Sequence, residues 1–257
     1  MSTQRKVESQ SIDVPRPVTL SIDIGGTHIK ASVLDPAGSM IAERIEIDTP
    51  YPADPANVLA AVGTLASALP GYDRVSAGFP GVVKLGHVLT APNLGTREWR
   101  NFDLATELEQ RLHVPVRVLN DAVVQGLGVV EGRDLECVLT LGTGVGCALY
   151  RNRRLILPME FGQHRARGRK TYDRYLGNAA LQAKGRKTWN KRLRKTIDAL
   201  SSLVNYDVLY IGGGNARKVD LDLPDIVRIV SNTAGITGGV RLWDGDMDEH
   251  FAAVCNA

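Results

Sequence analysis

Short apolar runs separated by glycine-rich turns open the chain. Residues 18–24 are rich in β-forming side chains and stop at a Gly-Gly-Thr turn, after which residues 28–34 return as a second apolar run. Two such runs around a tight turn predict a β-hairpin. Isoleucines on alternate positions between residues 41 and 47 indicate a third strand beside it.

Helical and extended patterns alternate through the rest of the first half. Residues 54–69 carry Ala, Leu and Val at helical spacing, residues 75–78 are extended, and Asp103 is an N-cap type before a helix that runs to residue 111. Residues 114–119 then form an apolar strand that stops at an Asn-Asp pair, and another helical pattern follows. This order of strands and helices predicts an α/β fold.

The second half repeats the opening hairpin. An apolar strand at residues 137–141 meets a Gly-Thr-Gly turn, and residues 145–150 return. Helical patterns follow at residues 172–184 and 188–204, and a buried strand at residues 208–211 runs into a glycine-rich loop. The recurrence predicts a duplicated α/β architecture of two lobes with a cleft between them.

These patterns divide the chain into two lobes and a tail. We expect a flexible N-terminal tail (1–17) and a first lobe (18–121) that a C-terminal helix (238–257) completes. The second lobe (122–237) is expected to contain a basic helical segment (165–195).

Cysteine content and hydropathy exclude several classes of protein. The three cysteines, at positions 137, 147 and 255, form no Cys-x-x-Cys pair, so neither a zinc site nor a disulfide framework is expected. No apolar run approaches the length of about 20 residues that a membrane span needs, and the N-terminus lacks the apolar core of a secretory signal. We expect a cytoplasmic protein with no membrane partner.

The first glycine turn carries candidate phosphate chemistry. Gly25 and Gly26 let backbone N–H groups approach an anion closely, and the Thr27 hydroxyl and the Lys30 ammonium add further donors. Asp23, at the end of the preceding strand, has the oxygen ligands that Mg²⁺ prefers. The alternative interpretation is an ordinary hairpin turn with a solvated aspartate, and the local sequence alone favours neither.

A second turn and a strand-end pair repeat this chemistry. The turn formed by Gly142, Thr143 and Gly144 is a second anion cradle, with a tight hairpin as its plain alternative. Asn120 and Asp121 stand where a predicted strand ends. Phosphoryl transfer needs a carboxylate that accepts a hydroxyl proton, and a helix N-cap is the competing interpretation of this pair.

Positive charge is concentrated in residues 165–195. This segment holds twelve Lys and Arg and one Asp, a net charge of +11, whereas the whole chain carries +3. An extended polyanion is therefore the expected partner, with nucleic acid and inorganic polyphosphate as candidates and a solvated helical face as the alternative. The predicted polyphosphate track consists of Arg167, Lys170, Lys187, Lys191, Arg192 and Lys195.

Together these motifs resemble the ROK family of sugar kinases and regulators, and more narrowly its polyphosphate-using glucokinases. The resemblance runs from residue 18 to residue 243. It rests on IDIGGT at 22–27, GFPG at 78–81, APNL at 91–94, LND at 119–121, GTGVG at 142–146, MEFGQH at 159–164, KTY at 170–172, KTWNKR at 187–192, YIGGGN at 210–215 and SNTAG at 231–235.

The resemblance implies a duplicated actin-like ATPase fold, of ribonuclease H type, and a kinase that phosphorylates glucose with polyphosphate, ATP or both, using Mg²⁺. Asp121 is implied as the general base on the sugar 6-hydroxyl, and Asp23 as the residue that positions Mg²⁺. The implied sugar ligands are Asn120, Asp121, Glu160 and His164, with Gly81 and Asn93 nearby. The implied donor ligands are Asp23, Gly25, Gly26, Thr27, Lys30, Gly142, Thr143 and Gly144, with Gly213 and Gly214 flanking the adenosine of ATP.

The chain departs from the family at two places. Gln163 stands where the family has its sugar-binding histidine, with His164 directly after it, so which of the two contacts the sugar is open. The cysteine-rich zinc motif of many members is missing, because no cysteine lies between positions 147 and 255.

Two other functions remain as alternatives. The first is an ATP-only hexokinase of the ROK family, for which the basic segment is incidental. The second is a non-catalytic sugar-responsive or polyanion-binding protein. ROK repressors carry an N-terminal helix-turn-helix, for which residues 1–17 are too short, so no nucleic-acid partner is expected. Relatives in the family imply a homodimer, and the choice of hexose and of phosphate donor stays open.

Overall fold

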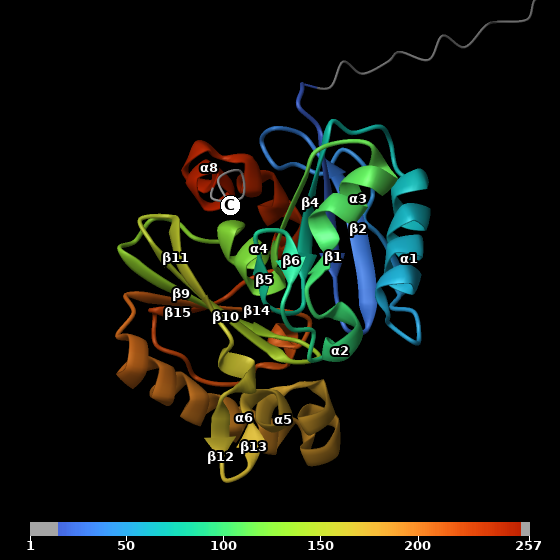
Figure 1. The fold of residues 1–257 in the computed structure, drawn as a ribbon. Coiled ribbons are helices and arrows are strands. Elements are labelled where there is room, and N and C mark those ends of the chain that lie inside the picture. Colours follow the sequence, from blue (N-terminus) through green and yellow to red (C-terminus); the bar gives the residue numbers. More distant parts are fainter. Residues whose placement is uncertain (1–14, 253–257) are drawn as a thin grey trace, which may run out of the picture.

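Two five-stranded sheets form the two halves of the molecule, as Figure 1 shows for the computed structural model, which describes residues 15–252. The first sheet has the order β3-β2-β1-β4-β8. Its strands are β1 (Thr19–Ile24), β2 (His28–Leu34), β3 (Ile45–Asp48), β4 (Arg74–Phe79) and β8 (Val116–Asn120). The second sheet has the order β11-β10-β9-β14-β15. Its strands are β9 (Leu135–Leu141), β10 (Val145–Arg151), β11 (Arg154–Met159), β14 (Val208–Gly212) and β15 (Val227–Ile229).

The pairing pattern is the same in both sheets. The central strand, β1 or β9, pairs antiparallel with its hairpin partner, β2 or β10, and parallel with β4 or β14 on its other side. Each sheet has one antiparallel edge strand, β3 or β11, and one parallel edge strand, β8 or β15. This repetition confirms the predicted duplicated α/β architecture.

Capped helices cover the outer face of the first sheet. Helix α1 (Pro55–Ser67) begins after Asp54, whose Oδ1 accepts a hydrogen bond from the Asn57 N–H at 2.9 Å. Helix α3 (Leu104–Leu112) begins after Asp103, whose carboxylate accepts from the Thr106 N–H at 3.1 Å, which confirms the predicted N-cap. The small elements beside them are β5 (Val83–Lys84), β6 (His87–Val88), α2 (Thr96–Trp99) and β7 (Phe102–Asp103).

Helix α4 (Asp121–Leu127) joins the two halves. It follows β8 directly and packs against β4 of the first sheet and β10 of the second. Its residues Val123, Val124 and Leu127 belong to a buried apolar cluster that lies between the cores of the two sheets. The helix therefore fixes the position of its own N-terminus relative to both lobes.

The predicted separation of helices 172–184 and 188–204 agrees with a non-helical residue at Gly185 (φ 72°, ψ 160°), which kinks α6 (Asn178–Val204). A further break, at Gly177 between α5 (Tyr172–Leu176) and α6, was not predicted. A Cβ on Gly177 would lie 2.4 Å from the Thr143 carbonyl oxygen. The chain leaves the helix here because its backbone packs directly on the second glycine turn, a contact that local periodicity does not reveal.

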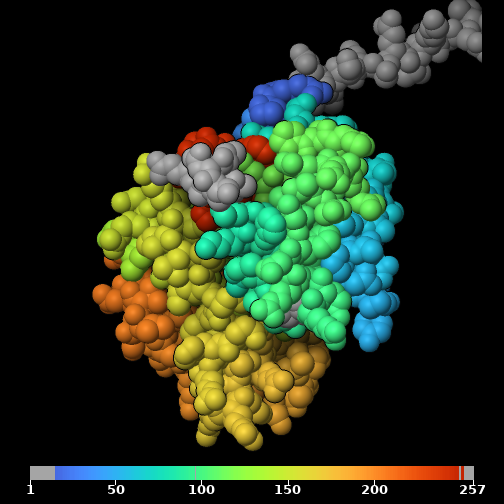
Figure 2. Space-filling model, viewed as in Figure 1, coloured from blue at the N-terminus to red at the C-terminus, as the bar shows by residue number. Residues whose placement is uncertain are grey.

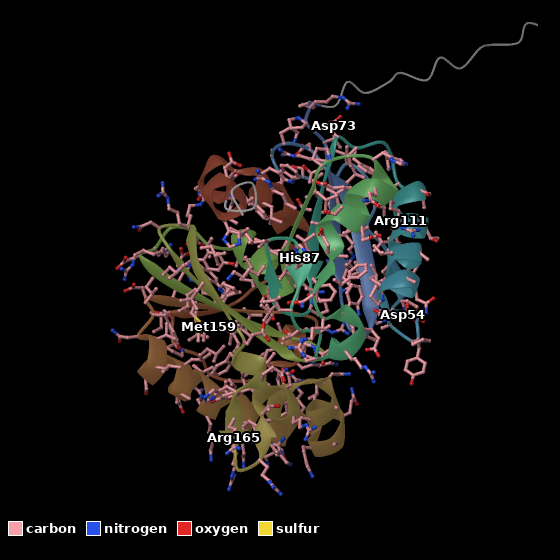
Figure 3. All side chains as sticks on the ribbon, viewed as in Figure 1. Asp54, Asp73, His87, Arg111, Met159 and Arg165 are labelled. Carbon is pink, nitrogen blue, oxygen red and sulfur yellow. The ribbon has the colours of Figure 1, made fainter. Side chains whose placement is uncertain are left out.

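The expectation of a helical segment over 165–195 is wrong for its first part. Residues of this part form a hairpin of β12 (Arg165–Arg167) and β13 (Lys170–Thr171), with Gly168 at a φ of 57° in the turn. A positive φ suits glycine and reverses the chain. The hairpin projects at the lower edge of the face in Figure 2, and Arg165 lies there among outward-pointing side chains in Figure 3.

The predicted C-terminal helix (238–257) is two shorter elements in its described part. The 3-10 helix η3 (Gly238–Trp243) ends at Asp244, which is extended, and α8 (Gly245–Ala252) follows. A Cβ on Gly238 would lie 2.0 Å from the Val124 carbonyl oxygen, so η3 approaches α4 more closely than a regular side-chain-bearing helix could.

The C-terminal elements pack on the first sheet. η3 contacts β1 and β4, and the Arg117 guanidinium of β8 lies 4.4 Å from the ring centre of Trp243. Residues 253–257 of the predicted helix, and residues 1–14 of the predicted tail, lie outside the described part of the chain. Within the described part, no helix combines the length and apolar character that crossing a membrane requires.

Candidate functional site

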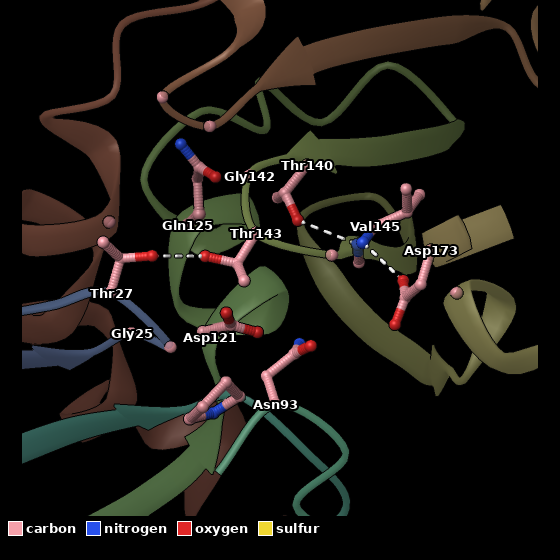
Figure 4. A pocket seen from close by; sticks show the side chains of 18 of the residues that line it. Gly25, Thr27, Asn93, Asp121, Gln125, Thr140, Gly142, Thr143, Val145 and Asp173 are labelled. Atoms are coloured by element: carbon pink, nitrogen blue, oxygen red, sulfur yellow. Dashed lines mark hydrogen bonds between the residues drawn. The ribbon is translucent and has the colours of Figure 1, made fainter. Parts of the chain in front are cut away.

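A pocket of about 390 Å³ is lined by residues of both lobes and collects most of the predicted site residues (Figure 4). The predicted residues that line it are Asp23, Gly25, Gly26, Thr27, Lys30, Gly81, Asn93, Asn120, Asp121, Gly142, Thr143, Gly144, Glu160, Gly213 and Gly214. The segments that carry them lie as far apart in sequence as Asp23 and Gly214, so the fold, and not local sequence, brings them together.

The two glycine turns meet across this pocket. The hydroxyl oxygens of Thr27 and Thr143 are 2.9 Å apart and form a hydrogen bond, drawn in Figure 4. A Cβ on Gly26 would lie 3.3 Å from Cγ2 of Thr143, so the first turn contacts the second closely. Each turn is a hairpin, as the plain interpretation proposed, and the two hairpins face one pocket.

Asp121 is the first residue of α4 and lines this pocket with its side chain partly buried. Burial raises the pKa of the Asp121 carboxyl group to about 7, and the nearby Asp23 and Glu160 carboxylates act in the same direction. The backbone N–H of Ala122 donates a hydrogen bond to Asp121 Oδ1 at 2.8 Å, which offsets part of this increase in pKa. A carboxyl group with this pKa can both accept and return a proton near neutral pH.

Asn120 is the N-cap of α4. Its Oδ1 accepts hydrogen bonds from the N–H groups of Ala122 at 2.9 Å and Val123 at 3.3 Å, and its Nδ2 donates to the Gly81 carbonyl at 3.1 Å. The capping interpretation of the Asn-Asp pair therefore applies to Asn120. Because Asn120 caps the helix, the carboxylate of Asp121 is not needed as a cap and faces the pocket.

Asp23 and Lys30 form a cross-strand pair just before and after the first turn. Lys30 Nζ lies 3.5 Å from Asp23 Oδ2. Burial raises the pKa of Asp23, and Lys30 counteracts this. Among the residues at 15–252, no cluster of three or more His, Cys, Asp or Glu could hold a metal ion. Any cation held by Asp23 must therefore take most of its ligands from elsewhere.

One end of the pocket, here called the Asp173 end, is built around the partly buried Asp173 carboxylate. Asp173 Oδ1 accepts from the Val145 N–H and its Oδ2 accepts from Gln163 Nε2, each at 2.7 Å. Burial raises the pKa of Asp173 and of Glu160, and the Asp173 charge raises the pKa of Glu160 further. Asn93 belongs to this end, because its Nδ2 would lie 3.0 Å from a Cβ on Gly144.

His164 lies outside the pocket. Its side chain is exposed, whereas Gln163 lines the pocket and contacts Asp173. Of the two neighbours that the sequence left open, Gln163 is the one in reach of a molecule bound in the pocket.

The other end, here called the Gly213 end, is formed by the glycine loop after β14. Asn215 Nδ2 donates to the Gly142 carbonyl at 3.0 Å, and a Cβ on Gly213 would lie 2.5 Å from the Leu141 carbonyl oxygen. Gly142, Gly214 and Arg217 line the pocket at this end. The two ends thus differ in chemistry: carboxylates at one, and backbone groups with an arginine at the other.

The six predicted track residues lie outside the pocket. Arg167 and Lys170 are exposed on the β12–β13 hairpin. Exposed lysines at 187, 191 and 195 follow α6 at four-residue spacing. Arg192 differs from them, because its guanidinium donates to the Tyr175 carbonyl at 3.0 Å and lies 4.7 Å from the Tyr175 ring centre. Arg192 therefore ties α6 to α5.

Sequence reasoning did not single out several polar residues that line the pocket, among them Gln125, Asn178 and Arg217. A signal existed for two of these three. Gln125 follows Asp121 by one helical turn, which places both on one side of α4. Arg217 follows the glycine loop by a few residues, where a cation suits an anion cradle. Asn178 depends on the break at Gly177 and had no local signal.

Comparisons with known proteins point to one family. Residues 19–164 match the ROK family. The chain is 31% identical over 244 residues to the polyphosphate glucokinase of Mycobacterium leprae (strain TN), covering 88% of this chain and 74% of that protein. It is 32% identical over 240 residues to the polyphosphate glucokinase of Mycobacterium tuberculosis (strain CDC 1551 / Oshkosh), covering 84% of this chain and 88% of that protein.

Solved structures share the fold over the same range. The crystal structure of the inorganic polyphosphate/ATP-glucomannokinase of Arthrobacter sp. strain KM matches with a TM-score of 0.80 at 28% identity, covering 88% of this chain and 98% of that one. A ROK family glucokinase from Streptomyces griseus matches with a TM-score of 0.76 at 20% identity, covering 88% of this chain and 98% of that one. With these likenesses and the duplicated actin-like architecture, the chain belongs to the ROK family.

Proposed function

We propose that this protein is a sugar kinase that phosphorylates glucose with inorganic polyphosphate or ATP as the donor. The observation that carries the proposal is the partly buried Asp121 carboxyl group, which lines the same pocket as two glycine turns whose Thr27 and Thr143 hydroxyls are 2.9 Å apart. The names of the relatives support it, since two are polyphosphate glucokinases and the Arthrobacter protein is a polyphosphate/ATP-glucomannokinase.

Asp121 is the proposed general base. A sugar hydroxyl, the 6-hydroxyl in glucose, donates a hydrogen bond to the carboxylate, which takes the proton as the hydroxyl oxygen attacks the terminal phosphorus of the donor. The new bond joins that oxygen to phosphorus, while the bond from phosphorus to the bridging oxygen breaks. The electron pair leaves with the shortened phosphate chain or with ADP. A pKa of about 7 keeps a useful fraction of Asp121 ionised at neutral pH.

The two pocket ends suit the two substrates. The Asp173 end offers carboxylates and amides, which pair with the donors and acceptors of sugar hydroxyls. Here we propose Glu160, Asn93 and Gln163 as sugar ligands, with Asn120 and Gly81 nearby. His164 stays a prediction on sequence resemblance alone.

The glycine turns suit the donor. Backbone N–H groups that line a cleft stabilise phosphate oxygens without any conformational adjustment, and glycine allows the close approach. We assign Gly25, Gly26 and Thr27 to one side of the donor and Gly142, Thr143 and Gly144 to the other. Lys30 supplies a cation on the first side.

Mg²⁺ fits the chemistry of the donor set. Asp23 and Asp121 are both partly buried and their charges interact unfavourably, so a dication near them would lower that cost. Mg²⁺ commonly takes one or two carboxylates and completes its shell with phosphates and water, which agrees with a pocket that lacks a larger ligand cluster within residues 15–252. We propose that Asp23 holds it through water; when bound, it neutralises charge on the donor phosphates.

Polyphosphate is favoured as a donor by an exposed lysine row. Lys187, Lys191 and Lys195 recur every four residues and lie on one side of α6, about 6 Å apart along the helix axis. Point charges on flexible stems suit a phosphate chain that carries no base to recognise. Arg192 is less suited to bind polyphosphate than these lysines, because its guanidinium already donates a hydrogen bond to the Tyr175 carbonyl.

A donor and sugar matrix tests the proposal. Purified protein with Mg²⁺ is supplied with polyphosphate, ATP or GTP, each against glucose, mannose, fructose and N-acetylglucosamine, and products are identified by ³¹P NMR. We expect glucose 6-phosphate from glucose with polyphosphate or ATP. No sugar phosphate from any pairing would refute the kinase proposal. Light scattering on the same sample tests the proposed homodimer, which a monomeric mass contradicts.

A further inference from the structure

A buried amide on α4 lacks a hydrogen-bond partner. Gln125 is 5% exposed, and within residues 15–252 its Nε2 is the one buried side-chain nitrogen or oxygen without a partner. Buried polar groups are almost always satisfied by protein, by ordered water or by a ligand, so an exception needs an explanation. An amide nitrogen carries two N–H donors and no acceptor, so the missing partner is an oxygen acceptor.

The amide belongs to the Gly213 end of the pocket. Gln125 and Asp121 both project from α4 into the pocket, one helical turn apart (Figure 4). The Gln125 amide packs on Gly212, the last residue of β14, where a Cβ would lie 2.8 Å from Nε2. Gly212 continues directly into Gly213, which places the amide beside the glycine loop and away from the carboxylates of the Asp173 end.

The surroundings select the chemistry of the partner. Ionised phosphate oxygens accept hydrogen bonds and donate none, and the Gly213 end presents backbone groups and the Arg217 guanidinium to them. Sugar hydroxyls both donate and accept, and the acceptors that they need, Glu160 and Asp173, lie at the other end. The acceptor that best completes the Gln125 amide is therefore an oxygen of a phosphate chain.

We propose that Gln125 is a further binding residue for the phosphate donor, whose side-chain amide donates a hydrogen bond to a non-bridging oxygen of the phosphoanhydride chain. The inference rests on the proposed function and adds a residue to it. Protein atoms cover the nitrogen in the present conformation, and rotation about the last side-chain bond, whose torsional preference is broad, turns an N–H towards the pocket. Inorganic polyphosphate and a nucleoside triphosphate share this chemistry.

Two substitutions separate a binding role from a packing role. Gln125→Glu keeps the shape but replaces the donor with an anion, and Gln125→Met keeps the length without polar groups. Gln110→Glu is the matched control, because it makes the same change at an exposed position of α3. Binding of inorganic tripolyphosphate and of a non-hydrolysable ATP analogue is measured by calorimetry with Mg²⁺, together with melting temperature and KM for glucose.

We expect Gln125→Met to weaken binding of the phosphate probes about tenfold, the effect of one hydrogen bond to a charged group, and Gln125→Glu to weaken it further. The KM for glucose should not change in either Gln125 variant. The Gln110→Glu control should bind both phosphate probes as tightly as the wild type. Weaker binding of tripolyphosphate alone, or of the ATP analogue alone, supports the inference and identifies which donor the amide contacts.

Unchanged binding of both probes to Gln125→Met overturns the inference, even if Gln125→Glu binds less tightly, because added charge repels phosphate without any native contact. In that case the amide fills space or holds a buried water molecule, and only the melting temperature should fall. A wild-type protein that binds tripolyphosphate but transfers no phosphoryl group refutes the proposed function, and the binding data still decide the role of Gln125.

Discussion

The two glycine turns occupy equivalent places in the two sheets but differ in charge. In the first sheet, the strand register pairs Asp23 with Lys30 beside the turn. In the second sheet, the corresponding pair is Thr140 with Gly146, where the Gly146 N–H donates to Thr140 Oγ1 at 3.1 Å. The pairing geometry is shared, so side-chain type alone makes the first turn ionic and the second neutral.

Because of this difference, we expect the two turns to have different roles in the pocket. The pKa of Asp121 depends on the ionic first turn, because the Asp23 carboxylate contributes to raising it. The neutral side offers hydroxyl and backbone groups that hydrogen-bond without changing charge. We therefore expect substitutions near the first turn to alter the chemical step and its pH dependence, and substitutions near the second turn to alter donor binding.

The largest expected effect is that of Asp121→Asn, which removes the proposed base from the ionic side. We expect kcat to fall about 10²–10⁴-fold, the usual contribution of general base catalysis, with little change in glucose binding. Steady-state kinetics and calorimetry measure the two quantities.

Thermal melting controls for loss of fold in this variant. Because burial raises the pKa of Asp121, the folded state binds the proton more tightly than the unfolded state, and stability declines as pH rises through about 7. Asp121→Asn should therefore melt at the same or a higher temperature than wild type at alkaline pH. Full activity of a folded Asp121→Asn protein would contradict the assignment.

A smaller effect is expected for Asp23→Asn, which removes the negative charge beside the first turn and leaves the Lys30 ammonium without its carboxylate partner. The Mg²⁺ concentration for half-maximal activity should rise about tenfold, as for other changes around bound metals. The pKa of Asp121 should fall, because the Asp23 charge raises it, so the rate should reach its plateau at lower pH. Mg²⁺ titrations at several pH values measure both, and an unchanged Mg²⁺ requirement would remove Asp23 from the proposed metal site.

The triple variant in which Lys187, Lys191 and Lys195 are each replaced by Gln tests whether positive charge outside the pocket contributes to binding of polyphosphate. Exposed ion pairs contribute up to about 1 kcal/mol each, so we expect the KM for long-chain polyphosphate to rise about tenfold, and less at high salt. The KM for ATP serves as the internal control and should not change. Equal effects on both donors would count against a polyphosphate track on α6.

The smallest effect is expected for Thr143→Val, which removes the hydroxyl contact between the turns while keeping the shape. Loss of one neutral hydrogen bond corresponds to about 1 kcal/mol, or a fewfold increase in donor KM. kcat should change less than KM, in contrast to Asp121→Asn. A large fall in kcat with unchanged donor KM would show that the second turn shares in the chemical step.

Features with a local cause could be predicted from the sequence. The N-cap at Asp103 and the two hairpins around glycine turns depend on neighbouring residues, and they occur where expected. The edge strand β11 and the break at Gly177 depend on contacts with other segments, β10 and the second glycine turn, and were missed.

The same distinction holds for the site. Motifs placed Asp121 and both turns in the pocket, because each sits at a strand end that the topology brings together. Motif order could not distinguish Gln163 from His164, since adjacent side chains point in different directions once the chain enters a 3-10 turn. Gln125 stands out only when the hydrogen bonds of its neighbours are known.

The pH dependence of kcat/KM for glucose tests the central claim most directly, since this ratio reports the ionisation of the free enzyme. If Asp121 is the base, kcat/KM should rise with pH as the carboxyl group loses its proton, with a midpoint at about 7. A profile that is already flat from acid to neutral pH would contradict the account, because the base would then ionise well below the pKa of about 7 that the pocket gives Asp121.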